Sequence, residues 1–173
     1  MNESEPNAAW RTCYRELSPK LLLFARQWVA DQADAEDVVQ MAFVKFWRRQ
    51  PAAPRSDWPL LYAAVRSTAL DLRRGAERRT RREADPAVEV LRGDASFFDR
   101  TVERREDGAV LEAALRSLPM EQREVLVLRI WGELTFAQIA ATLEQSINTV
   151  SSRYRYALEA LRHGLKPFIH ERF

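Results

Sequence analysis

Cysteine, histidine and glycine are scarce in this sequence of 173 residues, and each shortage excludes a kind of site. Cys13 is the only cysteine, so the chain has no disulfide framework and no cluster of thiolate metal ligands. His163 and His170 are the only histidines, which disfavours a histidine metal site or a catalytic triad. The 5 glycines form no phosphate-binding loop. We therefore expect no metal, no cofactor and no catalytic residue.

Long apolar runs are also lacking. No stretch approaches the roughly 18 apolar residues that a membrane-spanning helix needs. The N-terminal residues MNESEPNAAW lack the basic and then apolar pattern of a signal peptide. Together with the single cysteine, these absences predict a reduced, cytoplasmic protein without membrane insertion.

The composition is that of a globular helical protein, with 46% hydrophobic and 30% charged residues and few β-branched runs. Helical periodicity fades only between 84 and 106, where Pro86, Gly93 and mixed charges occur. A segment of about 20 residues is long for a loop inside one compact domain. We therefore predict an all-α chain with two small helical domains, 7–83 and 107–168, joined by a linker at 84–106.

The stretch from Leu134 to Leu161 has the pattern of two helices joined by a tight turn. Thr135 and Gln138 have the spacing of a capping box, and apolar residues then recur at helical spacing up to Leu143. The pattern breaks at 144–147. Asn148 is then predicted to cap a second helix, whose apolar stripe is Val150, Tyr154, Ala157, Leu158 and Leu161.

Short polar side chains and arginines lie off the apolar stripe of this second helix: Asn148, Thr149, Ser151, Ser152, Arg153 and Arg155. A helix-turn-helix places the start of its second helix in the major groove, where such side chains reach base edges and phosphates. The alternative is a pair of amphipathic helices with a solvated face. These six residues are our candidates for contact with duplex DNA.

The segment from Arg66 to Arg82 is strongly basic, with seven arginines against two carboxylates, a local charge of +5. It ends a predicted helix that begins after Ser56-Asp57 and carries Trp58 and Tyr62 near its start. Aromatic side chains beside a basic stripe are typical of single-stranded nucleic-acid sites. The alternative interpretation is that both aromatics belong to the core.

The N-terminal third contains further predicted helices. Ser18-Pro19 indicates the start of a new helix after one at 7–17, since proline is well tolerated at a first helical position. Three carboxylates, Asp34, Glu36 and Asp37, then begin a helix whose apolar face includes Phe43, Phe46 and Trp47. Carboxylates in a first turn are favoured by the helix dipole. They are either helix-stabilising residues or a docking surface for a basic partner.

These segments, in this order, resemble a bacterial RNA polymerase sigma factor of the two-domain, extracytoplasmic-function group. The resemblance rests on DAEDVVQMAFVKFW, WPLLYAAVRSTALDLRR and, after the linker, LRSLPMEQREVLVLRIWGELTFAQIAATL and INTVSSRYRYAL. It covers nearly the whole chain. One departure is Glu144, which stands where related turns often carry glycine.

The resemblance implies a function and a role for each segment. The chain would bind core RNA polymerase and direct transcription from promoters, with Asp34, Asp37, Gln40 and Phe43 as the polymerase contacts. The basic helix would open the minus-ten element and bind its melted non-template strand, through Arg66, Ser67, Asp71, Arg73 and Arg74. The helix-turn-helix would read the duplex minus-thirty-five element. Members of this group are often held by an anti-sigma protein.

Two other functions remain open from the residues alone. A stand-alone helix-turn-helix regulator would explain the C-terminal half and leave the acidic and aromatic N-terminal half without a role. An enzyme acting on RNA or DNA would need a carboxylate metal site or a nucleophile with its base, and neither is visible in the sequence.

Overall fold

The computed structural model describes residues 4–29, 31–49, 57–83 and 105–170. Within these ranges the chain forms seven helices and no strand, which confirms the all-α prediction. The chain divides into two compact units, 1–95 and 96–173. The predicted linker at 84–106 lies outside the described residues as far as 104, and a helix begins at Arg105.

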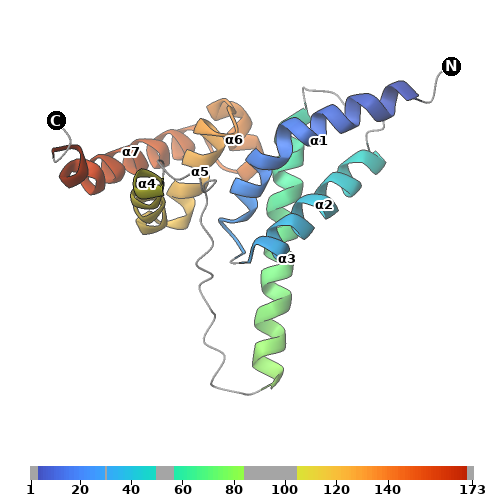
Figure 1. The fold of residues 1–173 in the computed structure, drawn as a ribbon, viewed down its shortest axis with the longest axis horizontal. Coiled ribbons are helices and arrows are strands. Elements are labelled where there is room, and N and C mark those ends of the chain that lie inside the picture. Colours follow the sequence, from blue (N-terminus) through green and yellow to red (C-terminus); the bar gives the residue numbers. More distant parts are fainter. Residues whose placement is uncertain (1–3, 30, 50–56, 84–104, 171–173) are drawn as a thin grey trace. The chain divides into compact units, whose positions relative to one another are not determined.

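The N-terminal unit consists of α1 (Ser4–Ala25), α2 (Gln32–Arg49) and α3 (Trp58–Glu83), which pack on one another (Figure 1). Each helix turns one apolar side inward, as its helical spacing predicts. The fully buried large side chains of this unit include Leu17, Leu21, Phe24, Val38, Val39, Leu61, Tyr62 and Val65.

The prediction of a new helix at Ser18-Pro19 is wrong, because α1 continues through Pro19. Proline removes one backbone donor from a helix, and the hydroxyl of Ser18 donates to the carbonyl of Tyr14 at 2.6 Å beside it. Contacts on both sides of the proline hold the helix in place. Tyr14 packs on Phe43 of α2 with ring centroids 4.8 Å apart, and Phe24 packs on Tyr62 of α3 at 5.5 Å.

One side of the first half of α3 is buried, whereas residues 73, 74 and 76–79 of its second half are exposed. Leu61, Tyr62, Val65 and Ala69 are at most 1% exposed, whereas the arginine-bearing end extends past α1 and α2 (Figure 1). One helix therefore both completes the core of its unit and carries the basic segment away from it.

The C-terminal unit contains α4 (Arg105–Ser117), α5 (Met120–Ile130), α6 (Phe136–Leu143) and α7 (Ile147–His170). Its core joins α4, α5 and α7, with Leu111, Trp131, Tyr154 and Leu161 packed against the buried Leu115, Leu118, Leu126 and Ala157. The long helix α7 thus has one side in the core along the part that contains the predicted DNA contacts.

The turn between α5 and α6 depends on a glycine for close packing. The backbone N–H groups of Trp131 and Gly132 both donate to the carbonyl of Val127, at 3.0 and 3.1 Å. A Cβ atom on Gly132 would lie 2.5 Å from the carbonyl oxygen of Leu128. The residue with a positive φ in this turn is Glu133, at 56°, and not Gly132. Glycine is therefore required at position 132 because a side chain would not fit, and not because of its backbone angles.

The starts of α6 and α7 confirm one predicted cap and correct another. The N–H of Thr135 donates to Oε1 of Gln138 at 2.8 Å, and the N–H of Gln138 donates to Oγ1 of Thr135 at 3.2 Å, as a capping box requires. The cap of α7 is Ser146, whose Oγ accepts from the N–H of Thr149 at 3.0 Å. Asn148, the predicted cap, is instead an exposed residue of the first turn of α7.

The turn between α6 and α7 is made by a left-handed glutamate. Glu144 has φ of 54° and ψ of 45°, and the N–H of Gln145 donates across the turn to the carbonyl of Ala140 at 2.9 Å. The left-handed conformation costs roughly 1–2 kcal/mol for a residue with a Cβ atom. The turn therefore keeps the usual geometry of a glycine turn at a cost in stability.

Replacing Gly132 by alanine is expected to destabilise the C-terminal unit by about 1–3 kcal/mol, the usual cost of forcing an atom into occupied space. Chemical denaturation of the full chain measures this change. Gly164→Ala is the matched control, since nothing lies within 4 Å of a Cβ atom there, and alanine favours the helix by up to about 1 kcal/mol. Equal stability of Gly132→Ala and the wild type would contradict the packing described for this turn.

Replacing Glu144 by glycine is expected to stabilise the helix-turn-helix by about 1 kcal/mol, because glycine adopts the left-handed conformation without strain. Amide hydrogen exchange in α6 and α7 measures this local effect. Gln145→Gly removes the neighbouring side chain without relieving a positive φ, and it should not stabilise. Slower exchange in both variants, or in neither, would show that the left-handed glutamate is not the source of the strain.

Candidate nucleic-acid and partner interfaces

The exposed side of α2 contains three of the four predicted polymerase contacts. Asp34, Asp37 and Gln40 are exposed, and residues three apart on a helix lie roughly 60° apart around its axis, so they form one stripe. Phe43 is different: it is 6% exposed and packs on Tyr14. In this structure Phe43 is a core residue that supports the helix, and its role as a polymerase contact stays a prediction.

Large apolar side chains accompany the acidic stripe. Met41, Val44 and Trp47 of α2 are 49%, 46% and 54% exposed. The sequence pattern placed Trp47 on the buried face, and the structure shows that it lies outside the core. Since exposed aromatic residues and methionine are enriched at protein interfaces, these three side chains extend the candidate partner surface.

The five predicted DNA contacts on α3 fall into two groups. Ser67, Asp71 and Arg74 lie on the side away from the core, where Asp71 and Arg74 form an exposed ion pair at 3.9 Å. Arg66 and Arg73 lie two turns apart along a flank, and Arg73 pairs with Glu77 at 3.6 Å. Exposed ion pairs contribute at most about 1 kcal/mol, so a phosphate group can replace either carboxylate.

An aromatic residue that sequence reasoning missed lies beside the second group. The guanidinium carbons of Arg66 and Arg73 lie 5.3 and 5.7 Å from the centroid of the Trp28 ring. Trp28 belongs to the connection between α1 and α2 and is half-buried. Only a three-dimensional contact reveals it, because Trp28 is far from both arginines in the sequence.

The two aromatic residues proposed as stacking platforms have different environments. Tyr62 is 1% exposed and packs against Phe24, so it is a core residue and cannot stack on a base. Trp58 is half-buried at the start of α3. The structure thus supports the core interpretation for Tyr62.

The six candidates on α7 are unequally exposed. Asn148, Ser151 and Arg155 are exposed, and the guanidinium of Arg155 lies 5.1 Å from the ring centroid of Tyr156. Thr149, Ser152 and Arg153 are half-buried, and Thr149 Oγ1 lies 2.8 Å from the Oγ of the capping Ser146. The groups most available to DNA are therefore those of Asn148, Ser151 and Arg155.

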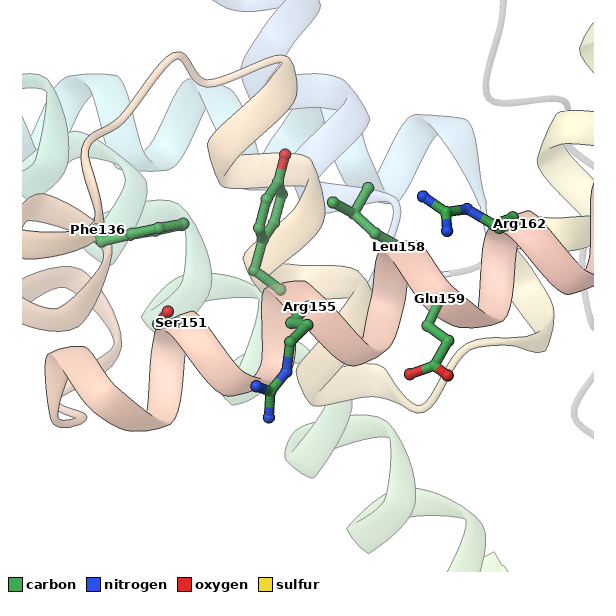
Figure 2. A pocket seen from close by; sticks show the side chains of 7 residues that line it. Phe136, Ser151, Arg155, Leu158, Glu159 and Arg162 are labelled. Carbon is green, nitrogen blue, oxygen red and sulfur yellow. The ribbon is translucent and has the colours of Figure 1, made fainter.

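A groove of about 470 Å³ runs along α7 and brings two of these candidates together with α6 (Figure 2). Its lining consists of Phe136, Ser151, Tyr154, Arg155, Leu158, Glu159 and Arg162. Leu158 was predicted to be part of the buried stripe, but it is 41% exposed and lines this groove. At the α6 end, the guanidinium of Arg129 lies 5.3 Å from the ring centroid of Phe136.

The described residues contain neither a candidate metal cluster nor a candidate membrane-spanning helix. Within the described ranges, no group of three or more histidine, cysteine, aspartate or glutamate side chains is placed to hold a metal ion. None of the helices in that part of the chain combines the length and the apolar character needed to cross a membrane.

Comparison with known families assigns both units. Residues 13–79 match the model for sigma-70 region 2, and residues 114–163 match the model for sigma-70 region 4. An RNA polymerase sigma-E factor of Streptomyces avermitilis is 35% identical over 146 residues, covering 84% of this chain and 79% of the relative. The chain belongs to the sigma-70 family. It is a sigma factor of the extracytoplasmic-function group and directs promoter-specific transcription.

A second sigma factor agrees with this assignment, and two solved structures share the fold. The ECF RNA polymerase sigma factor SigL of Mycobacterium tuberculosis is 31% identical, over 92% of this chain and 90% of its own. Among solved structures, the sigma factor RpoE of Bartonella quintana, in complex with the anti-sigma factor NepR, has a TM-score of 0.66 at 22% identity over 90% of this chain and 96% of that one. CnrH, in complex with the cytosolic domain of CnrY, has a TM-score of 0.61 at 24% identity over 95% of this chain and 92% of its own.

The family matches separate the competing functions. Region 2 accounts for the N-terminal half that a stand-alone helix-turn-helix regulator would leave unexplained, so that alternative is not favoured. The sigma-70 family is not a family of catalytic enzymes. The acidic stripe, Trp28 and the α3 contacts lie within region 2, and the candidates on α7 lie within region 4.

Proposed function

We propose that this sigma factor divides its contacts among three surfaces. The exposed stripe of α2 binds core RNA polymerase, the basic end of α3 binds the melted non-template strand of the minus-ten element, and α7 reads the duplex minus-thirty-five element. The observation that carries the proposal is the separation of charge within the N-terminal unit. Exposed carboxylates lie on α2, and exposed arginines lie on the part of α3 that extends beyond the core.

The α2 surface has the composition of a protein interface. Asp34 and Asp37 offer negative charge to a basic partner, and Met41 and Val44 offer apolar area at the centre of the same side. Complementary charge speeds encounter and fixes register, while buried apolar anchors supply most of the affinity. Phe43 supports this surface from the buried side of α2, where it packs on Tyr14 and holds α2 against α1.

The end of α3 has the groups that a melted strand requires. Arg66, Arg73 and Arg74 can neutralise phosphates, and the Asp71 carboxylate can accept hydrogen bonds from the amino group of an unpaired base. Unstacking a base costs a few kcal/mol, which these contacts must offset. Ser67 is small and allows close approach of the strand.

Duplex reading is assigned to the first turns of α7. Asn148 and Ser151 are short, exposed hydrogen-bonding residues at the end of the helix that enters the major groove in this motif. Arg155 lies farther along and reaches a phosphate or a guanine edge. Thr149, Ser152 and Arg153, being half-buried, contact the flanking backbone.

The protein itself makes and breaks no covalent bond in this proposal, because polymerase performs the chemistry. Weak contacts in two linked units add through their effective concentration on one promoter. The protein acts in the cytoplasm, where polymerase and promoters are found. An anti-sigma protein is a further candidate partner. Of the two solved structures with the same fold, RpoE is bound to the anti-sigma factor NepR, and CnrH is bound to the cytosolic domain of CnrY.

Reversing the charge of the acidic stripe tests the polymerase surface. Asp34→Lys combined with Asp37→Lys is expected to weaken binding to purified core RNA polymerase by at least about tenfold, because a basic partner surface would then face two lysines. Titration of labelled full-length protein with core enzyme measures the dissociation constant. Glu121→Lys combined with Glu159→Lys makes the same change in net charge on exposed residues of the other unit and should retain affinity. Equal affinity of both double variants would remove the stripe from the polymerase interface.

Removing one arginine tests the duplex surface. Arg155→Ala is expected to weaken holoenzyme binding to a duplex promoter and to lower the slope of log affinity against log salt by roughly one, the loss of one phosphate contact. Arg162→Ala is the control, because it removes an equal charge from an exposed site two turns farther along α7. An unchanged slope in Arg155→Ala, or the same decrease in both variants, would show that Arg155 makes no local phosphate contact.

A further inference from the structure

Trp28 links two arginines that the proposed function assigns to promoter DNA. Its ring lies within 5.3 Å of the Arg66 guanidinium carbon and within 5.7 Å of that of Arg73, measured from the ring centroid. The ring comes from the α1–α2 connection, and the two arginines lie two turns apart on one flank of α3. One aromatic side chain thus gathers two positive charges from separate turns of a helix.

Gathering these charges has an electrostatic cost that the indole ring offsets. Two guanidinium groups near one point repel each other, and the negative face of an aromatic ring attracts both. Tryptophan is the strongest such partner among the aromatic residues.

The choice of tryptophan also has a cost in the folded protein. Its indole N–H is buried and has no hydrogen-bond acceptor in the part of the chain that the structure describes. Burying an unsatisfied donor is unfavourable, and phenylalanine would fill much of the same space without one. Packing alone therefore gives no reason to prefer tryptophan here, whereas binding to two guanidinium groups does.

We propose that Trp28 is a positioning residue for promoter DNA. It holds Arg66 and Arg73 together as one cationic site for the phosphate backbone of the melted strand. An arginine side chain loses considerable rotamer freedom when it binds, and ordering both side chains in advance reduces that loss when DNA arrives. The proposal rests on the function assigned to α3, and it adds a residue outside the segments from which that function was inferred.

A double-mutant cycle in the full-length holoenzyme tests this inference. The probe is a forked DNA that carries a promoter mapped from transcripts started by this sigma factor with core polymerase. Four proteins are compared: the wild type, Trp28→Ala, Arg66→Gln combined with Arg73→Gln, and the triple variant. Trp28→Phe serves as a fifth protein that keeps an aromatic face. Affinity for the fork is measured against salt, together with affinity for core enzyme.

The expected result is a strong dependence of the Trp28 effect on the arginines. Trp28→Ala should weaken fork binding by roughly five- to thirtyfold, the effect of losing two cation–π contacts. Trp28→Phe should be intermediate, and affinity for core enzyme should be unchanged in both. In the background that lacks both arginines, Trp28→Ala should have no further effect.

Two outcomes separate this inference from the proposed function. If Trp28→Ala weakens fork binding equally with and without the arginines, Trp28 acts alone, as a base-stacking platform or a packing residue, and the inference is overturned. If the variant lacking both arginines binds the fork as the wild type does, the function assigned to this flank of α3 fails instead. Should Trp28→Ala not fold, Trp28→Phe in the two backgrounds gives the same decision.

Discussion

Burial of one side of the first half of α3 is the constraint on which the N-terminal unit depends. Leu61, Tyr62 and Val65 are removed from water by α1 and α2, and each fully buried side chain of this size contributes about 1.5–3 kcal/mol. The same helix then continues beyond the core. Arg73, Arg74, Arg78 and Arg79 on this part of the helix are exposed. A single helix thereby connects the stability of the unit to its DNA surface.

In the C-terminal unit, the turn between α6 and α7 positions the DNA surface. The capping box of Thr135 and Gln138 satisfies backbone donors at the start of α6, and Ser146 satisfies one at the start of α7. These contacts, with the burial of Ile139 and Val150, compensate for the left-handed Glu144. The turn sets the direction of α7 and leaves Asn148 unengaged by the cap, so that its side chain is exposed in the first turn of the recognition helix.

Local patterns predicted much of this fold, and two of the errors share a cause. The all-α class and the capping box follow from periodicity and short-range spacing, and both are confirmed. The break at Pro19 and the burial of Leu158 were wrong, because both depend on tertiary contacts that override a local preference. The cap at Asn148 was wrong because Ser146, two residues earlier, makes the capping hydrogen bond. The roles of individual residues came from the family resemblance, because helical spacing identifies a face but not its partner. Trp28 could not be predicted, as its contacts join distant parts of the sequence.

The most direct test of the account is to sequence the start sites of transcripts made by core RNA polymerase with the purified full-length protein. The account predicts discrete starts that are absent with core enzyme alone and preceded by two shared sequence elements at a constant spacing, one for each DNA-binding unit. Transcripts with the same scattered starts as core enzyme alone would contradict it.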